Sequence, residues 1–202
     1  MFRFKIFYIF IYLCFLVSGC AQRIANIDSS GEQIICFGNS ITKGEGSSPG
    51  NDYPALLSKE LDMEVINAGV NGDSTRDALN RIKKDVLKKN PRLVIVELSG
   101  NDFLQGIPKQ ETFSNLDKIV SMIQEQGAMV ILAEVRVEYF QDEDIKAFKG
   151  LAKKRQALLI PNILGGVLLN PELTSSDQLH PNDAGYRLIA EKVYRAIKPL
   201  LH

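Results

Sequence analysis

A serine near the start of the chain and an aspartate–histidine pair near its end are the residues with the clearest potential for chemistry. Ser40 follows the apolar run Ile34–Phe37 in the segment FGNSIT, and His180 follows Asp177 by three residues in SSDQLHPNDAG. The chain has two histidines, and the other, His202, is its last residue. In nucleophilic hydrolases an imidazole accepts the serine proton and a carboxylate fixes the tautomer of the imidazole. We therefore predict Ser40 as nucleophile, His180 as general base and Asp177 as the residue that orients His180.

Acyl transfer by a serine also requires hydrogen-bond donors for the oxyanion that develops on the carbonyl oxygen. The backbone N–H groups of Ser40 and Gly69 and the side-chain amide of Asn101 are the donors that the sequence offers. Glycine and asparagine are also common in turns, so these residues have a structural alternative. Their positions favour the chemical role, because the segments NAGVNGD and SGND each follow an apolar run, as the serine segment does.

The elements that must position these residues are indicated by short apolar runs that alternate with amphipathic segments. The continuous apolar character of the runs is typical of strands buried on both faces of a parallel sheet. The predicted strands are Gln33–Phe37, Glu64–Asn67, Arg92–Leu98, Ala128–Glu134 and Leu158–Ile160. The predicted helices are Tyr53–Leu61, Ser74–Lys89, Glu111–Gln126, Asp144–Lys154 and Ala184–Lys198. This alternation predicts an α/β fold, a three-layer α/β/α sandwich around a mostly parallel five-stranded sheet.

Open α/β sheets place their binding sites beyond the carboxyl ends of the strands. The segments GNSIT, NAGVNGD and SGND follow the first three predicted strands. We therefore expect Ser40, Gly69 and Asn101 to meet at one edge of the sheet. The loop before the last helix must bring Asp177 and His180 to the same edge.

The composition argues against several other classes of function. The chain carries 24 basic and 24 acidic residues, and the basic residues form no stripe or patch, so we expect no nucleic-acid partner. It contains no Walker motif and no cluster of His and Cys residues, so we expect no cofactor and no metal. A small-molecule or lipid ester is the partner that the serine site predicts.

The N-terminus has the composition of a targeting segment. Arg3 and Lys5 precede residues 6–17, which are almost wholly apolar but too few for a membrane-spanning helix of about 20 residues. A short charged segment, a short apolar core and small residues are typical of a secretory signal peptide. We therefore assign residues 1–19 to a signal peptide.

The end of this segment, VSGC, resembles the lipobox of bacterial lipoproteins, in which cleavage precedes the cysteine and that cysteine is acylated. The resemblance implies lipidation at Cys20 and a lipidated linker over residues 20–32, and we assign residues 33–202 to the domain that carries the serine site. Several acyl chains would anchor the protein stably to a membrane of the cell envelope. Ala21 after the cysteine favours the outer membrane, facing the periplasm, if the source has two membranes.

From about Gln33 to Lys198 the chain resembles the SGNH (GDSL) hydrolase superfamily, whose name comes from its Ser, Gly, Asn and His residues. Ser40 matches the nucleophile, Gly69 and Asn101 match the oxyanion positions, and Asp177 with His180 matches the DxxH pair. The resemblance implies a flavodoxin-like fold and a serine esterase that cleaves esters or thioesters through an acyl-enzyme.

Within the superfamily, the segments NAGVNGDST, PRLVIVELSGNDFLQG and LHPNDAGYRLIAE look most like the arylesterase branch. That branch includes the multifunctional periplasmic acyl-CoA thioesterase/lysophospholipase. Two residues depart from the family pattern. Asn39 stands where the usual GDS motif has aspartate, and Ser99 replaces the first glycine of GxND. An asparagine can still accept a hydrogen bond within the loop, so we expect activity to survive.

Two alternatives remain open, and a third is disfavoured by the sequence. The same site could serve a carbohydrate O-deacetylase, which would prefer acetyl groups to longer chains. A degenerate site in a non-catalytic envelope lipoprotein would bind without turnover. The segment SITK, residues 40–43, also fits the S-x-x-K motif of penicillin-binding proteins and β-lactamases, but no KTG follows and a parallel sheet is the wrong scaffold.

Overall fold

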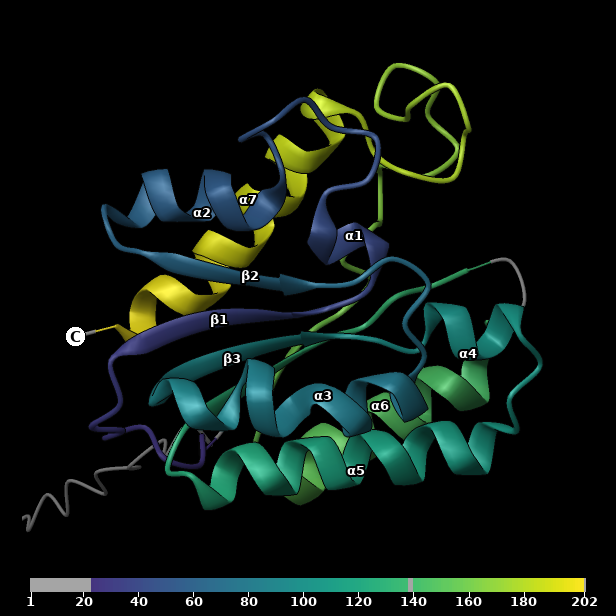
Figure 1. Cartoon of the computed structure of the whole chain (residues 1–202). Coiled ribbons are helices and arrows are strands. Elements are labelled where there is room, and N and C mark those ends of the chain that lie inside the picture. Colours follow the sequence, from purple (N-terminus) through teal and green to yellow (C-terminus); the bar gives the residue numbers. More distant parts are fainter. Residues whose placement is uncertain (1–22, 138–139, 202) are drawn as a thin grey trace, which may run out of the picture.

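Five parallel strands form one sheet in the order β2-β1-β3-β4-β5. Figure 1 shows β2, β1 and β3 side by side. The computed structural model describes residues 23–137 and 140–201. The strands are β1 (Gln33–Gly38), β2 (Val65–Gly69), β3 (Pro91–Glu97), β4 (Met129–Ala133) and β5 (Leu158–Ile160). Every pairing between neighbouring strands is parallel, so the carboxyl ends of all five strands lie at the same edge of the sheet.

Helices cover both faces of this sheet (Figure 1). One face packs against α2 (Tyr53–Leu61) and α7 (Asp183–Ile197). The other face packs against α3 (Thr75–Asp85), α5 (Lys109–Glu125) and α6 (Asp142–Arg155). Shorter segments complete the described fold: α1 (Ser40–Lys43), η1 (Leu87–Lys89), α4 (Gly100–Leu104) and η2 (Lys198–Leu200). The predicted three-layer α/β/α sandwich is therefore confirmed.

The central strands are apolar throughout because both of their faces are buried. In β1, Ile34 and Cys36 belong to the core beneath α2 and α7, whereas Ile35 and Phe37 belong to the core beneath α3, α5 and α6. All four side chains are inaccessible to solvent. Complete burial of such a side chain contributes roughly 1.5–3 kcal/mol to folding, so the two cores hold β1 firmly in the centre of the sheet.

The predicted bounds agree closely with the structure for most elements. The predictions for α2 and β5 are exact, and the predicted helix Ser74–Lys89 divides into α3 and the short helix η1. Ser74 and Asp77 form the capping box that starts α3, while the fully buried Val86 leaves helical geometry at a φ of −127° and ends it. The helices α1 and α4 were not predicted, because four or five residues show no helical periodicity.

Residues 23–32, which the sequence analysis assigned to a linker, contact the domain. The backbone N–H of Ala25 donates to the carbonyl oxygen of Gln156, and the side-chain amide of Asn26 donates to the carbonyls of Gln124 and Ala128. These bonds hold the segment at the amino-terminal ends of the strands (Figure 1). Cys20 and the predicted signal peptide lie outside the described residues, and within these residues no helix has the length and apolar character of a membrane span.

The junction between β3 and α4 is strained at Ser99. This residue is fully buried with a φ of +105°, a region that favours glycine, and it immediately precedes α4. Its hydroxyl oxygen has no hydrogen-bond partner among residues 23–137 and 140–201. The conformation explains why a glycine suits this position, and the serine adds the cost of a buried polar group without a partner.

We predict that Ser99→Gly stabilises the protein by about 1 kcal/mol, because relief of the backbone strain and of the unpaired hydroxyl exceeds the entropic cost of a glycine. Urea unfolding of the two proteins measures this difference. A variant that is less stable than the wild type would contradict the prediction, and Ser99→Ala, which removes only the hydroxyl, separates the two contributions.

Candidate active site

Three predicted residues form a continuous hydrogen-bonded chain at the carboxyl edge of the sheet. The Nε2 atom of His180 lies 2.9 Å from the Oγ atom of Ser40. On the other side of the ring, Nδ1 lies 2.7 Å from Oδ2 of Asp177. With Nδ1–H donating to Asp177, Nε2 is the free acceptor that a serine hydroxyl requires. The structure thus brings together the three residues that the sequence selected for nucleophilic chemistry.

Ser40 is held by a tight turn between β1 and α1. It is the first residue of α1, and the preceding Asn39 caps this helix by accepting a hydrogen bond from the Ile41 N–H at 3.0 Å. Gly44 ends α1 with a φ of +94°, and its N–H donates to the carbonyl of Ser40. Asparagine therefore supplies the hydrogen bond that the turn needs without a charge.

His180 and Asp177 lie in a compact loop that precedes α7. One carboxylate oxygen of Asp177, Oδ1, accepts hydrogen bonds from the N–H groups of Leu179 and His180 and from the hydroxyl of Ser175. The Ser175 N–H donates in turn to the carbonyl of His180 at 2.8 Å. Asn182 caps α7 and also donates to the carbonyls of two loop residues. These bonds position the imidazole without burying it.

The same bonds keep Asp177 ionised. The hydrogen bond from His180 is the main reason that the pKa of the Asp177 carboxyl lies well below its usual range, and donors from the backbone and from Ser175 add to this effect. A carboxylate that stays negative throughout the neutral pH range is suited to stabilise a positively charged imidazole.

A pocket of about 610 Å³ opens over Ser40 and His180. One part of its lining consists of polar residues and glycines and comprises Asn39, Ser40, Glu45, Asn71, Gly72, Gly100, Asn101, Asp177, Gln178 and His180. Another part is aliphatic and comprises Ile41, Leu104, Val135, Val137, Leu164, Leu168, Leu169 and Leu179. Phe103, which precedes Leu104, is not part of the lining and packs edge-on against Phe140.

The structure contradicts the prediction that the N–H of Gly69 is a donor for the oxyanion. Gly69 is the last residue of β2, where it pairs with Gly38, and its N–H donates to the side-chain oxygen of Asn67 at 2.9 Å. A Cβ atom at Gly69 would lie 2.2 Å from the Lys43 backbone nitrogen, so this glycine permits α1 to pack closely against β2. It is not part of the pocket lining, and its N–H is already satisfied.

Gly72 occupies the place in the pocket that the sequence analysis gave to Gly69. It lies in the turn after β2, has a φ of +79° and lines the pocket beside Asn101. Among the described residues, the N–H groups of Ser40 and Gly72 have no hydrogen-bond partner. The Asn71-Gly72 dipeptide is a recognised turn signal that could have identified this position from the sequence.

Asn101 lies in α4 and is tied to the same turn. Its side-chain amide donates one hydrogen bond to the carbonyl of Asp73 at 2.9 Å, which leaves the second N–H of the amide available. The turn is fixed from below by Arg81, whose guanidinium pairs with Asp73 and donates to the carbonyls of Gly38 and Ala68. Arg81 therefore connects the ends of β1 and β2 to the turn that carries Gly72.

A buried carboxyl group lies directly beneath the serine turn. Glu97, the last residue of β3, is fully buried, and its Oε2 accepts a hydrogen bond from the Thr42 hydroxyl at 2.8 Å. A Cβ atom at Gly38 would lie 2.7 Å from the same oxygen, so the glycine allows this close approach. Burial raises the pKa of Glu97 to about 7, although hydrogen bonds from Thr42 and Asn39 oppose the rise. The sequence gave no role to this residue.

Comparison with known proteins agrees with this geometry. Residues 36–188 match the GDSL-like Lipase/Acylhydrolase family. The chain belongs to this family. The match includes Ser40, Asn101, Asp177 and His180. The protein is therefore an SGNH-type enzyme that hydrolyses ester bonds.

Individual members of the family are similar over most of the chain. An arylesterase from Vibrio mimicus is 33% identical over 172 residues, which cover 80% of this chain and 86% of the relative. The thioesterase 1/protease 1/lysophospholipase L1 of Escherichia coli K12 is 27% identical over 86% of this chain and 87% of its own. The crystal structure of the psychrotrophic esterase EstA from Pseudoalteromonas sp., inhibited by monoethylphosphonate, has a TM-score of 0.76, is 26% identical and covers 84% of this chain and 98% of that chain.

The buried carboxyl predicts a specific dependence of stability on pH. Because the pKa of Glu97 is raised in the folded state to about 7, the folded protein holds a proton that the unfolded chain releases near pH 4.5. The free energy of unfolding should therefore fall by on the order of 3 kcal/mol as the pH rises through this window. Glu97→Gln, which keeps an acceptor for Thr42, should lose this part of the pH dependence.

Urea unfolding gives the free energy of unfolding of both proteins at about pH 5 and about pH 8. The effect of Glu97 is the change, between the two pH values, in the difference between wild type and variant. Other titrating groups cancel in the comparison because both chains contain them. Parallel stability curves for Glu97→Gln and the wild type would show that Glu97 does not bind this proton.

Proposed function

We propose that this enzyme hydrolyses carboxylic esters or thioesters through a covalent acyl intermediate on Ser40. The unbroken hydrogen-bonded chain from Asp177 through His180 to Ser40, at the floor of an open pocket, is the observation that carries the proposal. The names of the relatives support it, since an arylesterase and a thioesterase/lysophospholipase both cleave acyl groups.

In the first half of the reaction, Oγ of Ser40 bonds to the carbonyl carbon of the substrate while Nε2 of His180 accepts the hydroxyl proton. The π electrons of the carbonyl move to its oxygen, and Asp177 stabilises the imidazolium that forms. The tetrahedral intermediate then expels the alcohol or thiol, which takes the proton from His180. Water repeats the sequence on the acyl-enzyme, with His180 as base, and releases the carboxylic acid.

The oxyanion is stabilised by three donors from residues of the pocket lining. We assign them to the N–H of Ser40, the N–H of Gly72 and the second amide N–H of Asn101. All three residues line the pocket, and neither backbone N–H has a partner in the described parts of the chain. Removal of one such donor typically costs about 10²- to 10³-fold in rate.

The aliphatic part of the lining favours acyl groups longer than acetyl. Val135 and Leu164 are buried and Val137 and Leu168 are partly buried, and all four belong to one apolar cluster that lines the pocket. An acetyl group would leave most of this lining in contact with water. A longer alkyl chain would cover it and gain about 0.8 kcal/mol for each buried methylene. This supports an esterase or lysophospholipase rather than a carbohydrate O-deacetylase.

Replacement of the catalytic groups tests the mechanism. Ser40→Ala and His180→Ala should lower kcat by on the order of 10⁴-fold or more, because each removes a group that acts in the bond-making step. Asp177→Asn should cause a loss about 10- to 100-fold smaller. Initial rates on p-nitrophenyl esters from acetate to palmitate, with circular dichroism as a check of folding, measure both the losses and the chain-length preference.

A fluorophosphonate should label the wild type on the peptide that contains Ser40 and leave Ser40→Ala unlabelled. Turnover by Ser40→Ala at the wild-type rate would overturn the mechanism. An acetate-only profile would favour the deacetylase, and a folded protein that is neither labelled nor active would favour a binding protein.

A pair of glycine substitutions tests the assignment of Gly72. Gly72→Ala should lower kcat at least about tenfold, because a side chain at positive φ turns the N–H away from the oxyanion, whereas its Cβ meets no atom within 4 Å. Gly69→Ala forces its Cβ against the backbone of Lys43 and should mainly lower the Tm. Kinetics and thermal unfolding of both variants decide the question, and full activity of Gly72→Ala would remove it from the oxyanion site.

A further inference from the structure

Three leucines at the mouth of the active-site pocket are unusually exposed. Among residues 23–137 and 140–201 they are the most exposed large hydrophobic side chains: Leu169 is 99% exposed, Leu179 70% and Leu104 63%. All three line the pocket that contains Ser40. Single exposed leucines are common, but apolar side chains gathered around one opening mark a binding surface. We name these three residues the leucine rim.

The backbone of Leu169 shows that its exposure is not a by-product of packing. Leu169 has a φ of +68°, a left-handed conformation that is unfavourable for a large side chain. The preceding Leu168 is half-buried in the pocket wall, whereas Leu169 is almost completely exposed. No burial within the protein compensates for the conformation, which is the pattern expected where a strained backbone serves a function.

The polar residues described in the pocket lining around the rim include no lysine or arginine. A side-chain amide stands next to each rim leucine in the sequence: Gln105, Asn170 and Gln178. Within the described residues, the two carboxylates of this lining are Asp177, which is paired with His180, and Glu45, which accepts a hydrogen bond from the side-chain amide of Asn71. Leucines flanked by amides suit the boundary between alkyl chains and zwitterionic headgroups. The absence of lysine and arginine from the lining disfavours an anionic partner.

The leucine rim and the N-terminal residues 23–32 lie at opposite ends of the strands. The loop between β5 and α7 carries Leu169 and Leu179 and stands above α1 at the carboxyl edge, whereas residues 23–32 lie at the opposite ends of the strands (Figure 1). Contact between the rim and a surface therefore leaves the N-terminal segment free of that contact. The same contact places the pocket mouth, and Ser40 behind it, directly against that surface.

We propose that the leucine rim inserts into the surface of a zwitterionic lipid aggregate, from which an ester lipid passes into the pocket. The consequence for catalysis rests on the proposed function, but the contact itself does not require turnover. The partner is defined by its chemistry, namely alkyl chains under headgroups without net charge.

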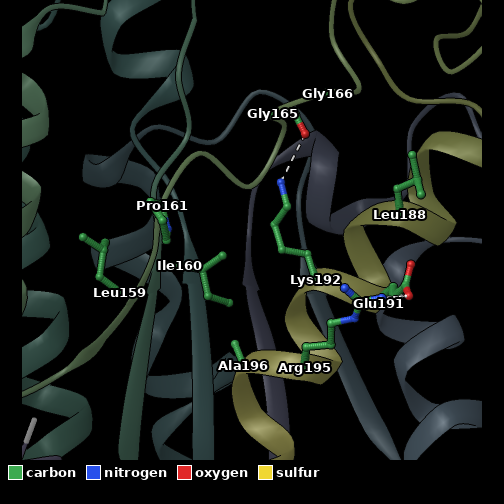
Figure 2. Close-up of a pocket in the computed structure, with 10 residues that line it drawn as sticks. All are labelled: Leu159, Ile160, Pro161, Gly165, Gly166, Leu188, Glu191, Lys192, Arg195 and Ala196. Carbon is green, nitrogen blue, oxygen red and sulfur yellow. Dashed lines mark hydrogen bonds and ion pairs between the residues drawn. The ribbon is translucent and has the colours of Figure 1, made fainter. Parts of the chain in front are cut away.

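A second pocket provides a matched control position. This pocket, of about 620 Å³, lies between β5 and α7 and shares no lining residue with the first. Figure 2 shows Leu188 at its border and Lys192 bonded to the carbonyl of Gly165. Lys192 also donates to the carbonyls of Asn162 and Ile163, so its charge is satisfied within the protein. Leu188 is 43% exposed and lies outside the rim.

The chain contains no tryptophan, so one introduced tryptophan reports its own surroundings without background. We would place it in the full chain as Leu169→Trp, Leu179→Trp or the control Leu188→Trp. Each variant is mixed with vesicles of diether phosphatidylcholine, which offers the serine site no substrate because the lipid has no carboxylic ester bond. Emission is recorded with and without a quencher attached to an alkyl chain, and circular dichroism checks folding.

The proposal predicts that emission from positions 169 and 179 shifts to shorter wavelengths and is quenched, while emission from position 188 is unchanged. The signal should persist at high salt, because contacts between apolar groups are not screened. No shift at 169 and 179, or an equal shift at 188, would overturn the proposal. A shift without vesicles that grows with protein concentration would assign the rim to contact between two copies and would also overturn it. Since no hydrolysis occurs, failure here is distinct from failure of the Ser40 mechanism.

Discussion

The parallel direction of all five strands is the constraint on which the rest of the structure depends. Each parallel connection must return to the opposite edge before the next strand can begin, so the loops that follow β1, β2 and β3 all emerge at one edge. Ser40, Gly72 and Asn101 come from these three loops. The remaining requirement is a base. The segment between β5 and α7 supplies it as His180, which lies 140 residues further along the chain and accepts a hydrogen bond from the Ser40 hydroxyl.

The residues predicted most securely from the sequence were those whose chemical type is rare. His180 had one competitor in the chain, and Ser40, Asp177 and Asn101 each occupied a distinctive segment. The strands were predictable for a different reason, since burial on both faces demands an unbroken apolar run. Gly69 was misplaced because two glycines occur within four residues, and spacing alone does not tell the end of a strand from the turn beyond it. That distinction depends on register: β2 continues as far as Gly69 because Gly69 pairs with Gly38.

Two residues close to the turn that carries Ser40 destabilise the fold. Glu97 is buried with one carboxyl oxygen unpaired among the described residues, and Ser99, two residues later, is strained and also lacks a partner for its hydroxyl. A sheet built only for stability would place apolar side chains at both positions. The hydrogen bond that Thr42 donates to Glu97 instead ties α1, which begins with Ser40, to the end of β3. Destabilising features of this kind commonly concentrate beneath functional residues.

Ser40 is held more firmly by the fold than Asp177 and His180 are. Ser40 stands on a turn clamped between two solvent-free cores, whereas Asp177 and His180 depend on a surface loop whose hydrogen bonds are mostly internal. Such loops open with far less free energy than the sheet beneath them. Opening separates the base from the nucleophile and leaves every strand in place. The geometry of the catalytic chain is therefore set by the least firmly held part of the domain and not by the sheet that carries the nucleophile.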